Sequence, residues 1–358
     1  MQKAPSSDLE QSIREAAAAL GFDACGFTHA QAPETWEDYT SWLAEGKHGK
    51  MEYLERHAEK KGNLNKLFDG TSSVISLAVS YHADHGGSLT SEDVSQQGVI
   101  ARYARHEDYH EVLKPALQAL CDRITAIAGP GYRHRAFLDT GPIMERDLAQ
   151  RAGMGFIGKH TNLISRSLGN WFFIAEILTT LELKPDSPEP NRCGTCERCM
   201  HACPTDAIPE PFRLDARKCI SYLTIELKGS IPEAMRSQIG NRIFGCDDCL
   251  TVCPWNRFAR EGRLMQQVQR SDLQTPELMD LLAMDQAAFK QKFANTPIMR
   301  TKRRGLLRNV CVALGNVGDT RALPLLQKRA ADVEPLIAEH AQWAIRRIRT
   351  KSSKREDA

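Results

Sequence analysis

Hydrophobic and polar residues in the first half of the chain follow the periods of both helices and strands. Residues 8–20 have apolar positions at helical spacing and end at Gly21, which predicts a first helix. Residues 74–81 are a continuous apolar run with β-branched side chains, which favours a buried strand. Further helices are expected at 110–127 and 145–152, a strand at 135–138 and a second buried element at 171–181. This alternation predicts an α/β or α+β domain that extends to about residue 183.

The pattern becomes purely helical after residue 260. Residues 272–293 predict a polar helical segment, and three amphipathic helices are expected at 305–317, 323–330 and 335–348. The last three resemble a HEAT-like helical repeat, with Leu-Gly-Asn before a Gly-Asp turn and Ala-Leu-Pro-Leu-Leu after it. A repeat of this length cannot bury a core alone. We therefore expect these helices to pack on the rest of the protein.

A proline-rich stretch at 184–191 separates the first domain from a region rich in cysteine. We therefore expect an α+β protein of three parts. The first part, 1–183, has an α/β architecture, the second, 184–260, holds most of the cysteines, and the third, 261–358, is helical. A chain of 358 residues with 42% hydrophobic content is long enough to bury cores for two or three such domains.

The N-terminal sequence and the absence of a long apolar span indicate a reducing compartment. The first residues, MQKAPSSDLEQSI, lack the apolar stretch of a signal peptide. The most apolar long segment, 163–181, contains Arg166 and Glu176, so it is expected in a core and not in a membrane. A cytoplasmic location follows, where the 11 cysteines are better suited to metal binding than to disulfides.

Two short motifs contain most of the cysteines. The first has the C-x-x-C-x-x-C-x-x-x-C-P spacing of bacterial ferredoxins and consists of Cys193, Cys196, Cys199 and Cys203. The second is shorter and consists of Cys246, Cys249 and Cys253. We expect Cys219, further upstream, to supply its missing cysteine. The remaining Cys25, Cys121 and Cys311 match no motif and are expected to be small buried apolar residues.

Ferredoxins with two clusters exchange ligands, because the last cysteine of each motif binds the other cluster. One 4Fe–4S cluster is therefore expected on Cys193, Cys196, Cys199 and Cys253. The second is expected on Cys203, Cys219, Cys246 and Cys249. The alternative is a pair of zinc sites, which also use C-x-x-C pairs but rarely add a third cysteine at the same spacing and then Cys-Pro. Two clusters form a one-electron relay, so the N-terminal domain should hold the group that receives the electrons.

Three further stretches are distinctive: YARHEDYHEVL at 103–113, FLDTGPIMERDLAQRAGMGFIGKHTNLI at 137–164 and CISYLTIELKG at 219–229. Together with both cysteine motifs and the helical tail, they resemble the epoxyqueuosine reductase family over nearly the whole chain. The stretch LDTGPIMER followed by GFIGKHTNLI is highly specific, and no plain ferredoxin is expected to carry it.

The resemblance implies an enzyme that binds cobalamin and feeds it electrons through two 4Fe–4S clusters. It implies removal of the epoxide oxygen of epoxyqueuosine at the wobble position of certain tRNA anticodons, which yields queuosine and completes its biosynthesis. It also implies a relationship to reductive dehalogenases. The residues themselves give no independent sign of cobalamin, because the D-x-H-x-x-G motif is absent: Leu113 stands where Asp108-x-His110 would require glycine.

The resemblance implies that Asp139 is the proton donor. Opening an epoxide creates an alkoxide, which needs a proton from a positioned acid. Asp139 follows the apolar strand 136–138, so partial desolvation is expected to keep its carboxyl protonated near neutral pH. From the local sequence alone, the alternative is a turn residue in Asp-Thr-Gly-Pro.

The resemblance also suggests which residues contact the cofactor. Tyr109 and His110 lie in the family's Asp-Tyr-His motif and are expected to line the pocket, although a histidine at a helix start is otherwise a cap or a surface residue. A glycine-rich loop is expected to let the backbone approach the corrin and its amides, and consists of Gly155, Gly158, Lys159 and Asn162. Ser221 and Thr224 follow ligand Cys219 and are expected to face the cofactor.

Positive charge is concentrated at the C-terminus. Residues 299–358 contain 14 Lys and Arg but six Asp and Glu, so this segment carries +8 and the rest of the chain −6, for a net charge of +2. A basic helical surface suits a phosphate backbone. The alternative is a solvated helix face, and the family's tRNA substrate favours RNA contact.

Two other functions fit the cysteine motifs. A plain two-cluster electron carrier leaves residues 1–183 unexplained. A reductive dehalogenase would carry a twin-arginine export signal and has no use for a basic helical tail. The expected partners are tRNA that bears epoxyqueuosine and an external electron donor, and the chain is expected to act as a monomer away from membranes.

Overall fold

The structure, a computed structural model, describes residues 6–83 and 97–356, with side chains from 9 to 353 in those ranges. The first half of the chain is built on a four-stranded sheet with the order β1-β2-β7-β4. The strands are β1 (Ala24–His29), β2 (Ser73–Ser80), β4 (His134–Leu138) and β7 (Phe172–Thr179). Every neighbouring pair is antiparallel. The protein is therefore a mixed α+β protein, and the α/β architecture expected for this half is not observed.

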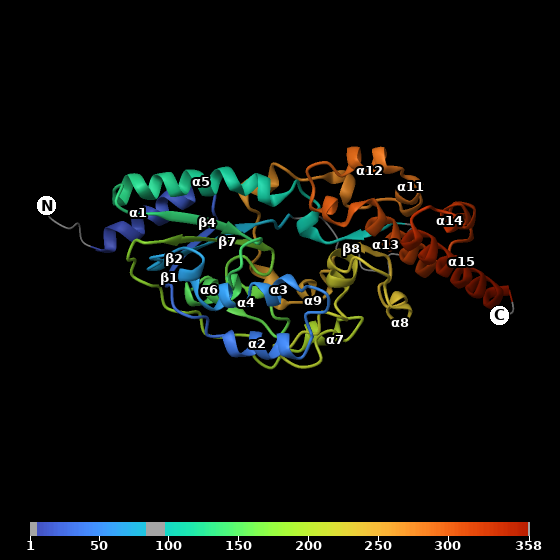
Figure 1. Cartoon of the computed structure of the whole chain (residues 1–358), viewed down its shortest axis with the longest axis horizontal. Helices are drawn as coiled ribbons and strands as arrows, with labels where there is room; N and C mark the ends of the chain where they lie inside the picture. Colours follow the sequence, from blue (N-terminus) through green and yellow to red (C-terminus); the bar gives the residue numbers. More distant parts are fainter. Residues whose placement is uncertain (1–5, 84–96, 357–358) are drawn as a thin grey trace.

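Helices cover both faces of this sheet (Figure 1). On one face lie α1 (Ser6–Ala19) and α5 (Tyr109–Ala128), and on the other lies α6 (Glu145–Arg151). Successive side chains of a strand point to opposite faces. Ile75 and Leu77 of β2 pack with α1 and α5, whereas Val74 packs with α6. Because both faces are covered, β2 is buried along its whole length, including its three serines, and shows no alternation of buried and exposed residues.

The strongest periodic patterns correspond to elements of the structure. The helices expected at 8–20, 110–127 and 145–152 are confirmed as α1, α5 and α6, and the segments at 74–81, 135–138 and 171–181 are the strands β2, β4 and β7. The segment 272–293 is not one helix, because it contains α11 (Leu278–Ala283) and α12 (Gln286–Lys292). The side chain of Asp285 accepts a hydrogen bond from Ala288 N and begins the second helix there.

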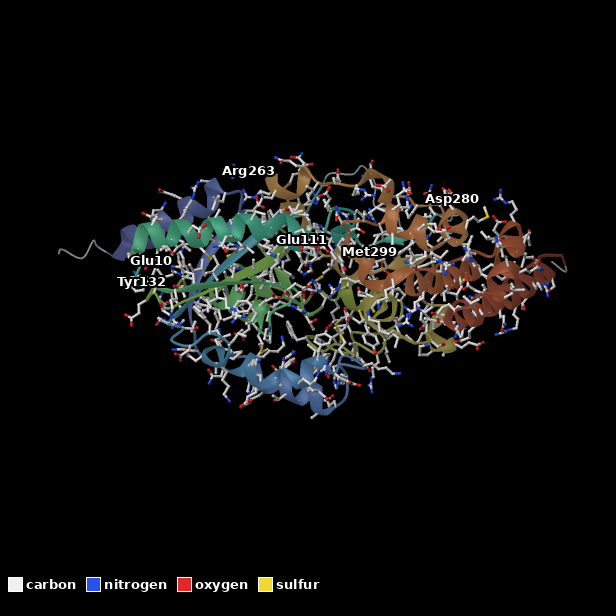
Figure 2. All side chains as sticks on the ribbon, turned by 45° about the horizontal axis from the view of Figure 1, so that its top comes forward. Glu10, Glu111, Tyr132, Arg263, Asp280 and Met299 are labelled. Carbon is white, nitrogen blue, oxygen red and sulfur yellow. The ribbon has the colours of Figure 1, made fainter. Side chains whose placement is uncertain are left out.

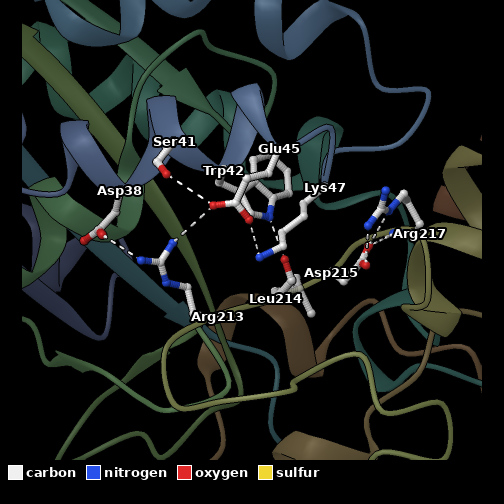
Figure 3. A network of polar contacts seen from close by, with 9 residues as sticks. All are labelled: Asp38, Ser41, Trp42, Glu45, Lys47, Arg213, Leu214, Asp215 and Arg217. Atoms are coloured by element: carbon white, nitrogen blue, oxygen red, sulfur yellow. Dashed lines mark hydrogen bonds and ion pairs between the residues drawn. The ribbon is translucent and has the colours of Figure 1, made fainter.

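A segment between β1 and β2 reaches across to the cysteine region. It forms α2 (Trp36–Ala44), α3 (Tyr53–Arg56) and α4 (Ala58–Gly62). Trp42 Nε1 donates a hydrogen bond of 2.6 Å to Leu214 O, and the Arg213 guanidinium lies 3.9 Å from the carboxylate of Asp38 on α2 (Figure 3). These contacts fix the first half of the chain to the loop that precedes Cys219.

The remaining elements are short until the C-terminal helices. They are β3 (Val99–Ile100), β5 (Phe156–Ile157), β6 (Leu163–Ile164), α7 (Arg198–His201), α8 (Glu233–Arg236), β8 (Arg242–Phe244), α9 (Asp248–Thr251) and α10 (Arg263–Gln266). The longer helices are α13 (Lys302–Val317), α14 (Leu323–Ala330) and α15 (Pro335–Glu356). Single turns of 3-10 helix lie at Leu64–Lys66, Arg102–Ala104, Pro254–Phe258, Ser271–Leu273, Pro297–Thr301 and Thr320–Ala322, and a π-helix at Tyr222–Glu226.

The three C-terminal helices share one core with the cysteine region. Leu306 and Val310 of α13 and Ala341 of α15 belong to the same buried cluster as Leu223 in the π-helix and Phe244 in β8. The helices extend from this core to the far end of an elongated molecule (Figure 1). As their sequence requires, they pack on the rest of the protein.

A buried arginine connects α13 to the π-helix. Arg308 is 1% exposed and donates hydrogen bonds of 2.6–2.7 Å to the carbonyl oxygens of Leu223, Leu227 and Gly229. Its neighbour Asn309 donates to the carbonyl oxygens of Thr224 and Ile243, both at 2.8 Å. Helix termini leave such carbonyl groups without partners, and burial makes that costly. The two side chains therefore stabilise the π-helix in an enclosed position.

Replacing this arginine should destabilise the whole cysteine region. In Arg308→Met three buried carbonyl oxygens lose a donor, so we expect the free energy of unfolding to fall by at least about 3 kcal/mol. Urea denaturation monitored by circular dichroism measures this change. The exposed Arg349 of α15 provides the control, because Arg349→Met should change stability by less than about 0.5 kcal/mol. Equal midpoints for the two variants would contradict the role of Arg308.

Candidate functional site

The end of β4 and the start of α5 bring the predicted catalytic residue together with two predicted pocket residues. Asp139 follows β4 directly, and Tyr109 and His110 are the first two residues of α5. Tyr109 Oη donates a hydrogen bond of 2.5 Å to Asp139 Oδ2, and His110 Nε2 lies 3.6 Å from the same oxygen as an ion pair. The Asp139 side chain is 46% exposed, so it can also reach a bound molecule.

The cap of α5 orients the imidazole. Asp108 precedes the helix and accepts hydrogen bonds from His110 N at 3.1 Å and from His110 Nδ1 at 2.7 Å. A carboxylate on Nδ1 fixes the ring and leaves Nε2 facing Asp139. On the other side, the Tyr109 ring stacks on Phe173 of β7 with a centroid distance of 4.2 Å. Both side chains that contact Asp139 are thus held by packing or by hydrogen bonds.

The charges around Asp139 reverse the expected protonation state. Burial would raise the pKa of Asp139, but His110, the Tyr109 hydroxyl and the charge of Arg300 together lower it to about 2. Burial would lower the pKa of His110, but the carboxylates of Asp108 and Asp139 raise it to about 9. At neutral pH the proton therefore resides on His110, and Asp139 is ionised. The expectation of a protonated Asp139 is wrong for this structure, because the hydrogen bonds from His110 and Tyr109 and the charge of Arg300 outweigh desolvation.

The backbone of Asp139 has a left-handed conformation, with φ at +56°. Its amide donates a hydrogen bond of 2.8 Å to Glu145 Oε1 on α6, which holds the turn in place. Burial and the charge of Asp139 raise the pKa of Glu145 to about 7. Behind it lies Glu176 of β7, which is fully buried and accepts a hydrogen bond of 2.8 Å from Ser76 Oγ. Asp139 therefore forms the turn expected from Asp-Thr-Gly-Pro, and its carboxyl group also makes the contacts described above.

Three residues at this site escaped the sequence analysis. Arg300 lies 3.6 Å from Asp139 Oδ2 and 3.7 Å from Glu226 Oε1, so it connects the end of β4 to the π-helix. Burial and the charges of Glu226 and Asp139 raise the pKa of Tyr53 to about 12, which places this 41% exposed phenol beside them. Arg300 was noted only as one of many basic residues, and nothing in the local sequence of Tyr53 or Glu226 signals the contact.

The start of α5 and the segment before α13 meet in the middle of the molecule. Glu111 and Met299, the neighbours of His110 and Arg300, both lie in this central region (Figure 2). The backbone confirms the contact, because Asp108 N donates a hydrogen bond of 2.7 Å to Asn295 O. Residues from segments far apart in the sequence thus form one site.

The glycine-rich loop forms a hairpin of its own, β5 and β6. A Cβ on Gly155 would come within 2.2 Å of Ile164 O, and one on Gly158 within 2.5 Å of the Ile164 side chain. Both glycines are therefore required by contacts within the protein. Lys159 is 8% exposed and its Nζ lies 3.9 Å from Glu197, while Asn162 N donates to the His160 ring at 3.1 Å.

Ser221 and Thr224, the two residues expected to face the cofactor, have different positions. Ser221 is half-buried, and its hydroxyl donates a weak hydrogen bond of 3.4 Å to Cys246 O. Thr224 is fully buried, donates to Ile220 O at 2.7 Å and accepts from Gly245 N at 3.0 Å. Contrary to expectation, Thr224 is enclosed by protein and does not face a cofactor, because the π-helix turns its side chain toward β8.

The eight motif cysteines separate into two groups in space. Burial and the thiols of Cys193 and Cys196 raise the pKa of Cys253, although Cys253 belongs to the other motif. Burial and the thiols of Cys246, Cys219 and Cys203 raise the pKa of Cys249. We call Cys193, Cys196, Cys199 and Cys253 the first set, and Cys203, Cys219, Cys246 and Cys249 the second set. This is the exchanged arrangement that the spacing predicts for two clusters.

A single metal ion does not explain these sets. In the described part of the chain, no three His, Cys, Asp or Glu side chains lie close enough to hold one ion. A 4Fe–4S cluster takes each thiolate on a different iron, so its ligands lie further apart than those of one zinc ion. Outside both sets, burial raises the pKa of Cys25, Cys121 and Cys311, as expected for inert thiols.

Several basic residues of the C-terminal segment support the fold. Arg308 is buried, Arg303 donates to Met284 O at 3.0 Å, and Arg329 donates to Leu282 O at 2.8 Å. Lys354 and Arg355, also counted in the basic segment, have side chains outside the described residues. The segment is therefore not a uniform basic surface, because part of its charge satisfies backbone carbonyl groups.

A smaller basic patch remains next to the site. Burial lowers the pKa of Lys228, and the nearby charges of Arg300, Arg308 and Lys302 lower it further. Arg304 lines the same small crevice as Lys228, at the start of α13. We call Lys228, Arg300, Lys302 and Arg304 the basic patch.

Family models match two regions of the chain. One, described as a 4Fe-4S double cluster binding domain, matches residues 192–256, and the chain accordingly carries two 4Fe–4S clusters. The other, described as epoxyqueuosine reductase QueG, DUF1730, matches residues 62–140, which include Tyr109, His110 and Asp139. Among the residues that the structure describes, no helix has the length and apolar character to cross a membrane.

Relatives and solved structures agree over almost the whole chain. A solved epoxyqueuosine reductase with a tRNA-Tyr epoxyqueuosine-modified stem loop is 31% identical, with a TM-score of 0.86 over 96% of this chain and 91% of that chain. Another, from Bacillus subtilis with an aspartate catalytic loop swung out of the active site, is 30% identical, with a TM-score of 0.86 over the same shares. Epoxyqueuosine reductase of Xanthomonas campestris is 43% identical over 95% of this chain and 96% of its own length. The chain belongs to the epoxyqueuosine reductase family.

Proposed function

We propose that this protein reduces epoxyqueuosine to queuosine at the wobble position of tRNA anticodons, the last step of queuosine biosynthesis, with cobalamin bound beside Asp139. The observation that carries the proposal is the carboxylate of Asp139 held between Tyr109, His110 and Arg300 while nearly half of it stays exposed. A related structure with an epoxyqueuosine-modified tRNA stem loop supports the substrate. A plain electron carrier would have no use for such a site.

The residues around Asp139 fit a large cofactor with a polar edge. Arg300 and Tyr53 are each 41% exposed, and Ser221 is partly exposed, so polar groups from separate segments converge without covering each other. The residues proposed to hold cobalamin are Tyr109, His110, Gly155, Gly158, Lys159, Asn162 and Ser221. When bound, low-valent cobalamin supplies a cobalt centre that is strongly nucleophilic or donates single electrons.

Reduction of the epoxide takes up two electrons and two protons and releases one water. An ionised Asp139 cannot donate a proton until it has received one. The protonated imidazole of His110, 3.6 Å from Asp139 Oδ2, is the nearest donor that changes charge near physiological pH. We infer that His110 transfers its proton to Asp139 as the alkoxide forms, while Asp108 stabilises the histidine through Nδ1. Tyr109 keeps the receiving carboxylate oriented.

We propose the same three-part organisation that the sequence predicts. Residues 1–183 would bind cobalamin and substrate, 184–260 would form a ferredoxin-like domain with both clusters, and 261–358 would be a HEAT-like region that contacts tRNA. The core shared by α13, α15 and the π-helix supports a close association of the last two parts. We also propose that the protein is a monomer, is located in the cytoplasm and receives its electrons from an external donor.

The basic patch is the proposed contact for the anticodon stem. It includes Arg300, which itself contacts Asp139, so a phosphate held there would lie next to the reacting base. Recognition of single-stranded loops lets a base leave the stack and enter such a site. This narrows the RNA surface from the whole C-terminal segment to the residues around the start of α13.

The cluster arrangement predicts a paired effect of distant cysteines. Cys193→Ala and Cys253→Ala should damage the same cluster, whereas Cys203→Ala should damage the other, because the ligands are exchanged between motifs. Anaerobic protein should contain close to eight iron and eight sulfide (from two clusters of four each), and EPR of the reduced variants should show which signal is lost. Zinc without sulfide, or separate effects of Cys193 and Cys253, would contradict the arrangement.

The proton pathway predicts both a rate and a pH effect. Asp139→Asn preserves shape but cannot carry a proton, so turnover on epoxyqueuosine tRNA should fall about 10²–10⁴-fold. Wild-type turnover should decline as pH rises through about 9, where His110 loses its proton. His110→Gln should turn over slowly and lack this decline.

Spectra of both clusters in the two variants, and of cobalamin in Asp139→Asn, serve as the control and should match the wild type. Near wild-type turnover of Asp139→Asn would rule out its role. A decline above pH 9 that persists in His110→Gln would assign the proton to another group.

The basic patch predicts local control of RNA affinity. Lys302→Glu/Arg304→Glu should weaken tRNA binding and reduce the slope of affinity against salt, because phosphate contacts act through released counterions. Binding is measured by fluorescence anisotropy with a labelled anticodon stem loop at several salt concentrations. Arg346→Glu/Arg349→Glu makes the same change of charge on exposed positions of α15 and should bind almost normally. Equal losses in both variants would instead assign RNA contact to the whole helical segment.

A further inference from the structure

The residues that surround the two thiol sets differ in exposure. The first set is bordered by residues that are exposed: Asn191, Arg192, Gly194, Thr195, Glu197 and Arg198. A Cβ on Gly194 would meet nothing within 4 Å, which shows open space beside the loop. The second set adjoins the interior, because Cys219 leads into the buried π-helix and Asp247, between Cys246 and Cys249, accepts a hydrogen bond from Arg102 N at 2.7 Å. Electrons from outside therefore reach the first set before the second.

The second set adjoins the catalytic site. The π-helix that begins after Cys219 ends at Glu226, which lies 3.7 Å from Arg300, and Arg300 contacts Asp139. An electron that enters at the first set thus moves inward through the second. The surface over the first set is the place where a donor would have to bind.

Arginine side chains surround this surface. Arg166 is 58% exposed and Arg192 43%, and both lie within 4 Å of Glu189, whose own side chain is only 16% exposed. Arg198 and Arg257 are also exposed. Glu197 is an exposed acid beside this loop, and it is paired with Lys159 at 3.9 Å and with His201 at 3.8 Å. Positive charge therefore dominates around the first set.

An exposed aromatic side chain accompanies these charges. Phe258 is 40% exposed, follows Cys253 closely, and lies 4.6 Å below the guanidinium of Arg257. The turn that carries Arg166 packs on the same short helix, because Asn170 N donates to Asn256 Oδ1 at 3.2 Å. We call Arg166, Arg192, Arg198, Arg257 and Phe258 the arginine rim. Arginine and aromatic residues are enriched at protein interfaces.

We propose that the arginine rim is the docking surface for a small acidic protein that carries single electrons. Opposite charges accelerate the encounter of two proteins and orient them, and electron carriers need a brief contact close to the acceptor. Each encounter passes one electron: the carrier is oxidised by one electron and the first cluster is reduced by one. Two encounters provide the two electrons that one epoxide consumes.

RNA is the other anionic partner that could bind arginine. The basic patch at the start of α13 already adjoins the catalytic residues, whereas the arginine rim surrounds the first thiol set. The proximity to the cluster favours an electron carrier. The proposal rests on the two clusters and not on the identity of the RNA base, so it can be tested without the epoxide reaction.

The test measures cluster reduction in anaerobic holoenzyme by stopped-flow absorbance, with flavodoxin hydroquinone as the acidic carrier. The second-order rate constant should fall as salt rises. At low salt, Arg192→Glu/Arg198→Glu should lower it roughly tenfold or more. Because these two residues adjoin ligand cysteines, Arg166→Glu/Arg257→Glu provides a second variant outside the ligand loop and should behave alike.

Two controls isolate docking from cluster damage. Photoreduced 5-deazariboflavin, a small uncharged reductant, should reduce the clusters of all variants at the wild-type rate. Arg346→Glu/Arg349→Glu on α15 makes the same change of charge and should keep the wild-type rate with flavodoxin. An unchanged rate for both rim variants would overturn the proposal. Loss of affinity for the anticodon stem loop without loss of the reduction rate would assign the rim to RNA.

Discussion

The hydrogen bonds from Arg308 to the π-helix are the interaction on which the rest of the site depends. The π-helix leads from cluster ligand Cys219 to Glu226, and Glu226 holds Arg300 near Asp139. Burial and the charge of Arg304 lower the pKa of Arg308 to about 10, so its guanidinium still carries charge at neutral pH. One buried side chain thus sets the position of a cluster ligand and of a residue in the catalytic site, and explains why α13 is inseparable from the cysteine region.

The cysteine groups could be predicted from sequence because their spacing is itself the geometric constraint. A loop of three cysteines at equal spacing can wrap one cluster, and the exchanged fourth ligand follows from the Cys-Pro step. Strand and helix positions were predictable for the same reason, since period and burial are local. The antiparallel order of β1, β2, β7 and β4 was not, because an alternating pattern of elements also suits parallel sheets.

The catalytic site was only partly predictable. Asp139 and His110 lie in motifs, but their protonation depends on Arg300, which lies far from both of them in the sequence. A count of charges likewise could not distinguish Arg308, which is buried, from Lys302, which is exposed. The burial of a charged residue and the contacts between distant segments are properties of the folded chain. A local sequence pattern does not predict them, and only a resemblance to a known family can indicate them.

The left-handed turn at Asp139 restricts which acid can serve in this position. Outside glycine, aspartate and asparagine adopt a positive φ most readily, because their short polar side chains tolerate it. Glutamate has the same carboxyl group, but it adopts a positive φ less readily. Its longer side chain would also carry the carboxyl past Tyr109 and His110. The backbone conformation and the chemistry therefore both select aspartate at position 139. Replacing it by glutamate would strain the turn and also displace the carboxyl group.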